Sequence, residues 1–247
     1  MKLSFLGNGV MACAMIDGLL ENGYKIEVFG RDIEKLKELN KKYQNGLEIF
    51  EYKQDTDITG KSLIICVKPY ALSKISHFFT GTADMIISVL ANTSLEELQK
   101  NIKSKSYIRA MPNIAASYKK SMTTLTGDVT KKDEALKVLG AIGRTLWVDS
   151  EKEFDIATIL AGSSPAFLAL VSEALIDGAV KEGLKRNDAA ALTKGLFDGF
   201  AALLENYPHP ALIKDAVMSP GGVTAKGIAI LEEGKVRDSF IKVTQKK

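Results

Sequence analysis

The chain has 247 residues, of which 46% are hydrophobic and 26% charged, as in ordinary soluble globular proteins. This length accommodates one large or two small domains with a hydrophobic core that needs no disulfide or metal. The 33 basic and 30 acidic residues leave a net charge of +3, too small to indicate a nucleic-acid or membrane partner. The composition excludes a collagen, a coiled coil, a disulfide scaffold and a disordered chain.

The only cysteines, Cys13 and Cys66, each lie within an apolar run, as expected of buried thiols in a reducing compartment. The sequence starts directly with an expected strand rather than a signal peptide, and its uncharged apolar stretches are shorter than the ~20 residues that cross a bilayer. We therefore expect a cytoplasmic protein that does not enter a membrane.

Short apolar runs alternate with helical segments over the first 150 residues. The run at 62–67 is almost wholly apolar, as in a strand buried on both faces. The alternation predicts an α/β fold with a mostly parallel, doubly wound sheet in a first domain, 1–150. Expected strands lie at 3–6, 25–29, 62–67, 85–90, 106–110, 122–125 and 145–148, and expected helices at 10–21, 32–43, 131–142 and from Ser94 onward.

The second domain, 151–247, is expected to be all helical. Its segment 164–180 carries only two charges, Glu173 and Asp177, so most of that helix must be buried. A helical domain of under a hundred residues offers little bulk to bury it. We therefore predict burial against a second copy of the chain in an obligate homodimer.

A glycine-rich motif follows the first strand and opens the first helix. It has the G-x-G-x-x-G/A pattern of Rossmann-type dinucleotide sites, in which the helix N-terminus receives a pyrophosphate. The alternative is a tight turn that binds nothing. The expected cofactor-binding residues here are Gly7, Asn8, Gly9, Val10, Met11 and Ala12.

The second strand ends at Gly30, where NAD-binding sites usually carry an acid that holds the ribose hydroxyls. The next residue, Arg31, can pair with a 2′-phosphate, and its alternative is a solvated loop arginine. We therefore expect NADPH as the cofactor, with NADH as the alternative. Asp32 is either a ribose ligand or the cap of the next helix.

Two further strand ends are expected to line the cofactor cleft, since open parallel sheets bind ligands at the carboxyl ends of their strands. Lys68 either meets phosphate or substrate or is solvated, and Asn113 either orients the nicotinamide or forms an Asx turn. The expected cofactor contacts are Val67, Lys68 and Pro69, and Met111, Pro112 and Asn113.

The segment 219–224 reads Ser-Pro-Gly-Gly-Val-Thr and precedes a helical run to Glu233. Pro-Gly-Gly ends the preceding helix and leaves free amide groups at the next helix start, which is a geometry that binds carboxylates. The alternative is an ordinary capped turn. The expected substrate-binding residues are Ser219, Gly221, Gly222, Val223 and Thr224. His77 and His209 are isolated, so we expect no metal site.

Taken together, the motifs named above resemble those of the pyrroline-5-carboxylate reductase family, nearly end to end. The matching segments are 7–12, 67–69, 109–113, 161–166, 173–180, 219–224 and 231–232, and Ser-Pro-Gly-Gly-x-Thr is the most specific of them.

The resemblance implies a Rossmann domain followed by a helical domain that interlocks with its twin, with dimers often built into larger rings. It implies reduction of a cyclic imine, 1-pyrroline-5-carboxylate, to L-proline by hydride from NAD(P)H. The substrate carboxylate is then held by the backbone of Ser219, Gly222 and Val223. The hydroxyl of Thr224 bonds the ring nitrogen and is the expected catalytic group.

The chain departs from the family at Ser164, where relatives usually have glycine, and it lacks part of their longer last helix after Phe240 and Ile241. We expect the first difference to affect affinity or substrate range and the second to affect assembly beyond the dimer. Two alternatives remain: an NADP-binding sensor without catalysis, and a β-hydroxyacid dehydrogenase. The catalytic lysine of the latter has no counterpart in 162–171.

Overall fold

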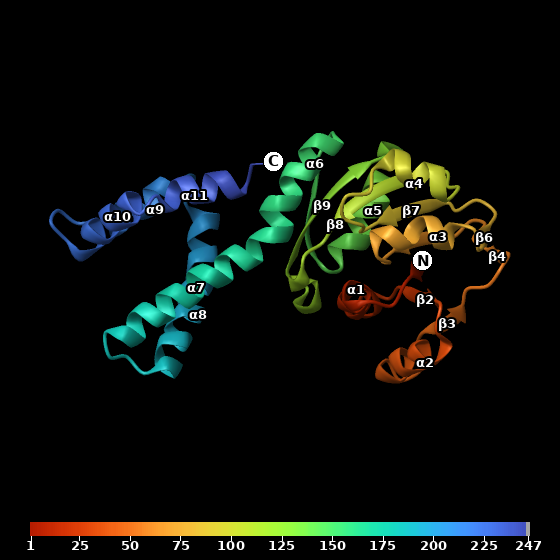
Figure 1. The fold of residues 1–247 in the computed structure, drawn as a ribbon, viewed down its shortest axis with the longest axis horizontal. Helices are drawn as coiled ribbons and strands as arrows, with labels where there is room; N and C mark the ends of the chain where they lie inside the picture. Colours follow the sequence, from red (N-terminus) through yellow and green to blue (C-terminus); the bar gives the residue numbers. More distant parts are fainter. Residues whose placement is uncertain (246–247) are drawn as a thin grey trace. The chain divides into compact units, whose positions relative to one another are not determined.

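The computed structural model describes residues 1–245, and the chain forms two compact units, Met1–Ser163 and Ser164–Lys247 (Figure 1). The predicted domains were 1–150 and 151–247. The first unit extends beyond residue 150 because the next helical segment packs on its sheet. Lys246 and Lys247, the end of the predicted second domain, lie outside the described residues.

The first unit contains an eight-stranded sheet in the order β10-β9-β8-β7-β5-β1-β2-β3. Its described pairings are parallel except for that of β8 with β9, which confirms the predicted doubly wound, mostly parallel sheet. The strands are β1 (Lys2–Leu6), β2 (Lys25–Gly30), β3 (Glu48–Glu51), β5 (Ser62–Ile65), β7 (Met85–Ser88), β8 (Tyr107–Met111), β9 (Ser121–Gly127) and β10 (Gly143–Trp147).

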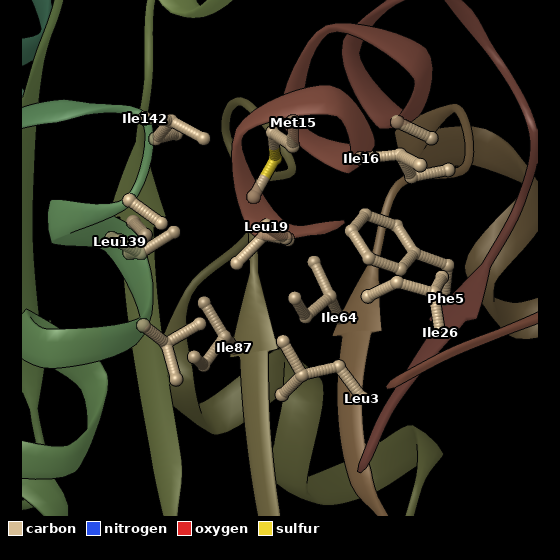
Figure 2. Close-up of a cluster of buried hydrophobic side chains, with 14 of the residues drawn as sticks. Leu3, Phe5, Met15, Ile16, Leu19, Ile26, Ile64, Ile87, Leu139 and Ile142 are labelled. Atoms are coloured by element: carbon tan, nitrogen blue, oxygen red, sulfur yellow. The ribbon is translucent and has the colours of Figure 1, made fainter. Parts of the chain in front are cut away.

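Helices cover both faces of this sheet. Side chains of α1 (Val10–Glu21), α2 (Ile33–Lys42) and α5 (Lys132–Gly140) share one buried cluster with the strands. In Figure 2, Met15 and Leu19 of α1 point toward Ile64 of the sheet, within this cluster. The opposite cluster takes side chains from α3 (Leu72–Ser76) and α4 (Leu95–Asn101).

The strand β5 is buried on both faces, as its apolar run predicts. Ile64 belongs to the first cluster, whereas Leu63 and Ile65 belong to the second. Four short elements were not predicted: β3, α3, and the two strands of a separate sheet, β4 (Thr56–Asp57) and β6 (Phe79–Thr80). Edge strands, two-residue strands and one-turn helices need no long apolar run, so the sequence contains little signal for them. Three 3₁₀ turns complete the unit: η1 (Pro69–Ala71), η2 (Ile114–Tyr118) and η3 (Val129–Lys131).

From residue 151 onward the regular elements of the described chain are helical, which confirms the predicted helical region. The first unit ends with α6 (Glu151–Ala157) and η4 (Thr158–Ser163), a π-helix. The second unit comprises α7 (Ser164–Lys181), α8 (Arg186–Asn206), α9 (Pro210–Val217), α10 (Val223–Glu233) and α11 (Val236–Val243).

Helix α7 is apolar, yet none of its residues is buried in the described chain. Leu170 is 67% exposed, and leucines of α8 such as Leu192 are similarly exposed. The helical stretch Glu151–Lys181 is long and apolar enough to cross a membrane by length and composition. This stretch is longer than any of the uncharged apolar stretches considered in the sequence, because α6, η4 and α7 follow one another directly and the stretch includes a few charged residues. A surface of this kind requires an apolar neighbour.

Candidate functional site

The first candidate site lies at the carboxyl ends of the parallel strands. In the sheet, β2 and β5 lie on opposite sides of β1, so the connections leaving β1 and β5 diverge at this point. Open α/β sheets bind ligands outside the strand ends at such a switch point. The loops that follow β1, β2, β5 and β8 therefore meet at one edge, and they contain the predicted cofactor-binding residues.

The loop after β1 leaves room for a ligand at the start of α1. Gly7 has φ +106°, and a Cβ there would lie 2.9 Å from the carbonyl oxygen of Cys66, so only glycine fits. A Cβ at Gly9 would meet no described atom within 4 Å, and Val10 is 85% exposed. Gly9 is the N-cap residue of α1, and no side chain of the described residues accepts a hydrogen bond from the first amides of this helix. The first turn of α1 also contains no acidic residue. These amides and the helix dipole fit a pyrophosphate.

At the end of β2 the structure separates the two charged candidates. The carboxylate of Asp32 accepts hydrogen bonds from the backbone amides of Glu34 (3.1 Å) and Lys35 (3.2 Å), so it caps α2. Arg31 is exposed at the strand end. A Cβ at Gly30 would lie 3.0 Å from Leu36, so packing also favours glycine there. Of the two candidates, only Asp32 is therefore engaged as a helix cap.

The loop after β5 lies against the glycine motif. The amide of Cys66 donates to the carbonyl of Leu6 at 2.9 Å, and Val67 lies beside Gly7. Lys68 is exposed, and Pro69 begins the 3₁₀ turn η1. The structure thus brings this predicted segment beside the predicted pyrophosphate site.

The end of β8 presents Met111, Pro112 and Asn113, of which the last two are buried. The Asn113 carboxamide accepts from the amide of Ala115 at 3.0 Å, which is the Asx turn weighed in the sequence. Its Nδ2 also donates to the carbonyl of Ala161 at 2.9 Å. Asn113 therefore holds η4 against the strand end, a role that sequence reasoning missed.

The second candidate site is the turn between α9 and α10. Gly221 has φ +70°, and the amide of Gly222 donates to the carbonyl of Ser219 at 3.0 Å. A Cβ at Gly222 would lie only 2.4 Å from Ser219 Oγ. In the described chain no side chain caps Gly222, and Val223 is 87% exposed. A helix start of this kind offers free amides to a carboxylate, and Thr224 follows in its first turn.

Both cysteines are free and half-buried, and burial raises the pKa of the Cys13 and Cys66 thiols. Raised pKa values make thiols poor nucleophiles. Among residues 1–245 no group of three or more histidine, cysteine, aspartate or glutamate side chains is arranged to hold a metal ion.

Arg109 lies in the segment 109–113 that resembles the family, and the sequence alone indicates no role for it. Its guanidinium is buried, and it pairs with Glu151 at 2.7 Å and Asp155 at 3.3 Å. An arginine inside an otherwise apolar strand was the available signal, because a buried charge needs partners. The partners could not be identified from the sequence, since they lie more than 40 positions away.

Two family models match the chain. Residues 151–247 match the model described as pyrroline-5-carboxylate reductase dimerisation, and residues 2–92 match that described as NADP oxidoreductase, coenzyme F420-dependent. The pyrroline-5-carboxylate reductase of Helicobacter pylori is 33% identical over 97% of this chain and 95% of its own. That of a Synechocystis species is 34% identical over 99% and 94%.

The chain belongs to the pyrroline-5-carboxylate reductase family. The match spans both units, and it confirms the resemblance on which the sequence interpretation rests. The chain is thus an oxidoreductase, and its N-terminal part has the fold of NADP-dependent reductases.

Solved structures of the family agree in fold. The 1-pyrroline-5-carboxylate reductase of Streptococcus pyogenes superimposes with a TM-score of 0.84 and 29% identity over 99% of this chain and 96% of that one. A Plasmodium falciparum pyrroline carboxylate reductase with NADP bound gives 0.80 and 23% identity over 99% and 95%. The sensor and the β-hydroxyacid dehydrogenase considered from the sequence are not favoured by these relatives.

Proposed function

We propose that this protein reduces 1-pyrroline-5-carboxylate to L-proline with NADPH. The observation that carries this proposal is sequence identity of 33% and 34% to two pyrroline-5-carboxylate reductases over nearly the full length of the chain. The two uncapped helix starts add physical support, since one fits a pyrophosphate and the other a carboxylate. The balance is one imine, one NADPH and one proton giving one proline and one NADP⁺.

The cofactor is held by the loops at the strand ends. The amides at the start of α1 bind the pyrophosphate, and the Arg31 guanidinium pairs with the 2′-phosphate. Because Asp32 is engaged as a cap, it is a poor ligand for ribose hydroxyls, and NADPH is preferred to NADH. When bound, the cofactor supplies the hydride. The remaining contacts are Gly7, Asn8, Gly9, Val10, Met11, Ala12, Gly30, Val67, Lys68, Pro69, Met111, Pro112 and Asn113.

The substrate is held by the turn between α9 and α10. The backbone amides of Ser219 and Val223 bind its carboxylate, the Gly222 amide closes the turn onto the Ser219 carbonyl, and Gly221 supplies the left-handed residue that shapes the turn. The Thr224 hydroxyl donates a hydrogen bond to the ring nitrogen. This bond makes the C=N carbon more electrophilic as the hydride arrives, and it strengthens as the nitrogen becomes an amine.

The active species is a homodimer in the cytoplasm, and two homodimers or more can build a ring. The exposed apolar faces of α7 and α8 supply the interface, and residues 151–247 match a dimerisation model. The functional domains are 1–150 and 151–247, because the match to the dimerisation model begins at residue 151. The free cysteines are consistent with a reducing compartment.

The role of Thr224 is tested by two substitutions. We expect Thr224→Ala to lower kcat roughly 10- to 100-fold, the effect of about 1.5–3 kcal/mol in the transition state. Thr224→Ser retains the hydroxyl and is expected to keep most of the rate. Steady-state kinetics with pyrroline-5-carboxylate measures both. An unchanged kcat in the alanine variant removes Thr224 from the mechanism.

A further inference from the structure

Arg109 is a buried cation in a strand whose other inward side chains are apolar. It lies in β8, is 4% exposed, and sits two residues before the strand ends at Met111. A charge at this depth needs charged or polar partners nearby.

Its partners all come from one helical turn of α6. Nη1 lies 2.7 Å from Oε1 of Glu151, and Nη2 lies 3.3 Å from Oδ1 of Asp155. The guanidinium carbon lies 4.3 Å from the ring centroid of Phe154, which is itself fully buried. The same Glu151 oxygen accepts from the amide of Leu95 at 3.0 Å. Arg109 thus joins the start of α6 to β8, and its partner Glu151 joins the same turn to the start of α4.

The other end of this segment is fastened by the same strand end. Asn113 donates to the carbonyl of Ala161, and a Cβ at Gly162 would lie 3.5 Å from Met111 Cγ. Between the two attachments lies the π-helix η4, in which Thr158 Oγ1 is buried without a hydrogen-bond partner in the described chain. Short π-helical turns occur often at functional sites.

The cluster is not arranged for maximum stability. Within residues 1–245, Arg109 Nε is buried and has no hydrogen-bond partner. Buried ion pairs can often be replaced by apolar side chains of similar volume without loss of stability. Such a replacement would, however, lose orientation. The planar guanidinium and its carboxylate partners hold α6 in one position relative to β8, and apolar side chains do not.

We propose that Arg109 is a positioning residue for hydride transfer, acting through Glu151 and Asp155 to hold residues 158–163 against Met111–Asn113. This inference rests on the proposed function, in which Met111 and Asn113 line the cofactor site. Arg109 touches neither substrate nor cofactor in this account. Its effect comes from fixing the backbone that does, and small displacements of reacting groups have large effects on rate.

The test compares Arg109→Lys with Glu27→Gln. Glu27 is buried on the same sheet and is bonded by Lys2, Lys61 and Ser4 toward the amino ends of the strands, so its loss costs stability far from the site. We expect Arg109→Lys to lower kcat about 10-fold or more, with the KM for NADPH changed less than about three-fold. The deuterium isotope effect on kcat, measured with C4-deuterated NADPH, is expected to rise. Folded Glu27→Gln is expected to keep kcat and its isotope effect.

Hydrogen exchange supplies a readout that needs no turnover. In Arg109→Lys, amides of peptides covering 151–163 are expected to exchange faster than in the parent protein, whereas Glu27→Gln leaves them unchanged. If Arg109→Lys does not fold, the combination Arg109→Met, Glu151→Gln, Asp155→Asn is used, because it removes all three charges together and keeps polar side chains at Glu151 and Asp155, which are 35% and 31% exposed. It too is expected to lose about 10-fold in kcat.

If the parent protein is active and the Arg109 variants have the same kcat and the same hydrogen exchange as the parent, the positioning role is overturned and the proposed function is not. A kcat loss that matches the unfolded fraction, as in Glu27→Gln, would overturn it as well. A parent protein that does not oxidise NADPH with pyrroline-5-carboxylate would overturn the proposed function and this inference together.

Discussion

The Asn113 side chain donates a hydrogen bond to the carbonyl oxygen of Ala161 at 2.9 Å. In an α-helix that carbonyl would accept from the amide of residue 165, but residue 165 is proline and has no amide hydrogen. Asn113 therefore supplies a donor to a carbonyl that Pro165 cannot serve. The bond joins the cofactor strand β8 to the segment that carries Gly162 and Ser163.

This relationship predicts coupling between two substitutions. Asn113→Ala is expected to cost about 1–3 kcal/mol in the free energy of unfolding, because it removes the bond to the half-buried Ala161 carbonyl and the bond from the Ala115 amide. In a Pro165→Ala background the new amide can donate to Ala161, so the same substitution is expected to cost about 1 kcal/mol less. A double-mutant cycle by urea unfolding measures the difference. Strict additivity would show that Pro165 and Asn113 act independently.

The cofactor preference depends on Arg31. Arg31→Ala is expected to raise the KM for NADPH about 10- to 100-fold, the effect of losing a charge-assisted bond, and to leave the KM for NADH nearly unchanged. Lys25, an exposed cation at the amino end of the same strand, provides the control, because Lys25→Ala should change neither KM. Equal effects of Arg31→Ala on both cofactors would contradict the 2′-phosphate assignment.

Asp32 is predicted to act on stability rather than on ribose. Asp32→Ala is expected to cost about 1 kcal/mol in unfolding free energy, and Asp32→Ser to preserve it, since serine also caps helices well. Thermal unfolding and NADH binding check the two variants. A large loss of NADH affinity in Asp32→Ser, with stability intact, would restore the carboxylate as a cofactor ligand.

The substrate turn is sensitive to a single methyl group. Gly222→Ala is expected to raise the KM for pyrroline-5-carboxylate strongly, because its Cβ would meet Ser219 Oγ at 2.4 Å, while NADPH affinity stays unchanged. Gly140→Ala at the end of helix α5, where a Cβ meets nothing within 4 Å, is the matched control outside the substrate turn and the proposed interface. It is expected to be neutral or to stabilise by up to about 1 kcal/mol. A Gly222→Ala enzyme with normal KM would place the substrate elsewhere.

Acid sensitivity is predicted at Glu27. Burial alone would raise the pKa of this carboxyl, but hydrogen bonds from Lys61, Ser4 and Lys2 hold it below its ordinary value of about 4.5. A lowered folded-state pKa contributes stability above the unfolded value and loses it as the pH falls through the folded value.

Glu27→Gln is therefore expected to destabilise by about 3 kcal/mol or more at pH 7. The difference from the parent protein should begin to shrink below pH about 4.5, where Glu27 of the unfolded parent takes up a proton, and shrink further as the pH falls through the lower folded-state pKa and the ion pairs are lost. Urea unfolding at several pH values gives both curves. A constant difference across that range would mean that the charge of Glu27 contributes nothing.

The local signals in the sequence were sufficient for seven of the eight strands of the main sheet and for both helix starts. Apolar runs marked the central strands, and Gly7, Gly221 and Gly222 marked turns that their φ values or close contacts require, whereas Gly9 leaves open space at the start of α1. The cap at Asp32 was one of two alternatives, and only the contacts to Glu34 and Lys35 distinguish them.

Long-range attachments could not be predicted. The partner of Asn113 lies 48 positions away, and those of Arg109 lie 42 and 46 positions away, so no spacing rule connects them. The edge strand β3 was also missed, because Glu48 and Glu51 end a strand that needs few apolar side chains. Such features depend on which surfaces the fold brings together.

The central claim is tested most directly by measuring NADPH consumed and proline formed in the same reaction, with pyrroline-5-carboxylate as substrate and NADH in a parallel arm. The account predicts saturable oxidation, one proline for each NADPH, and a lower kcat/KM with NADH. Binding of NADPH without oxidation, or oxidation without proline, would contradict it.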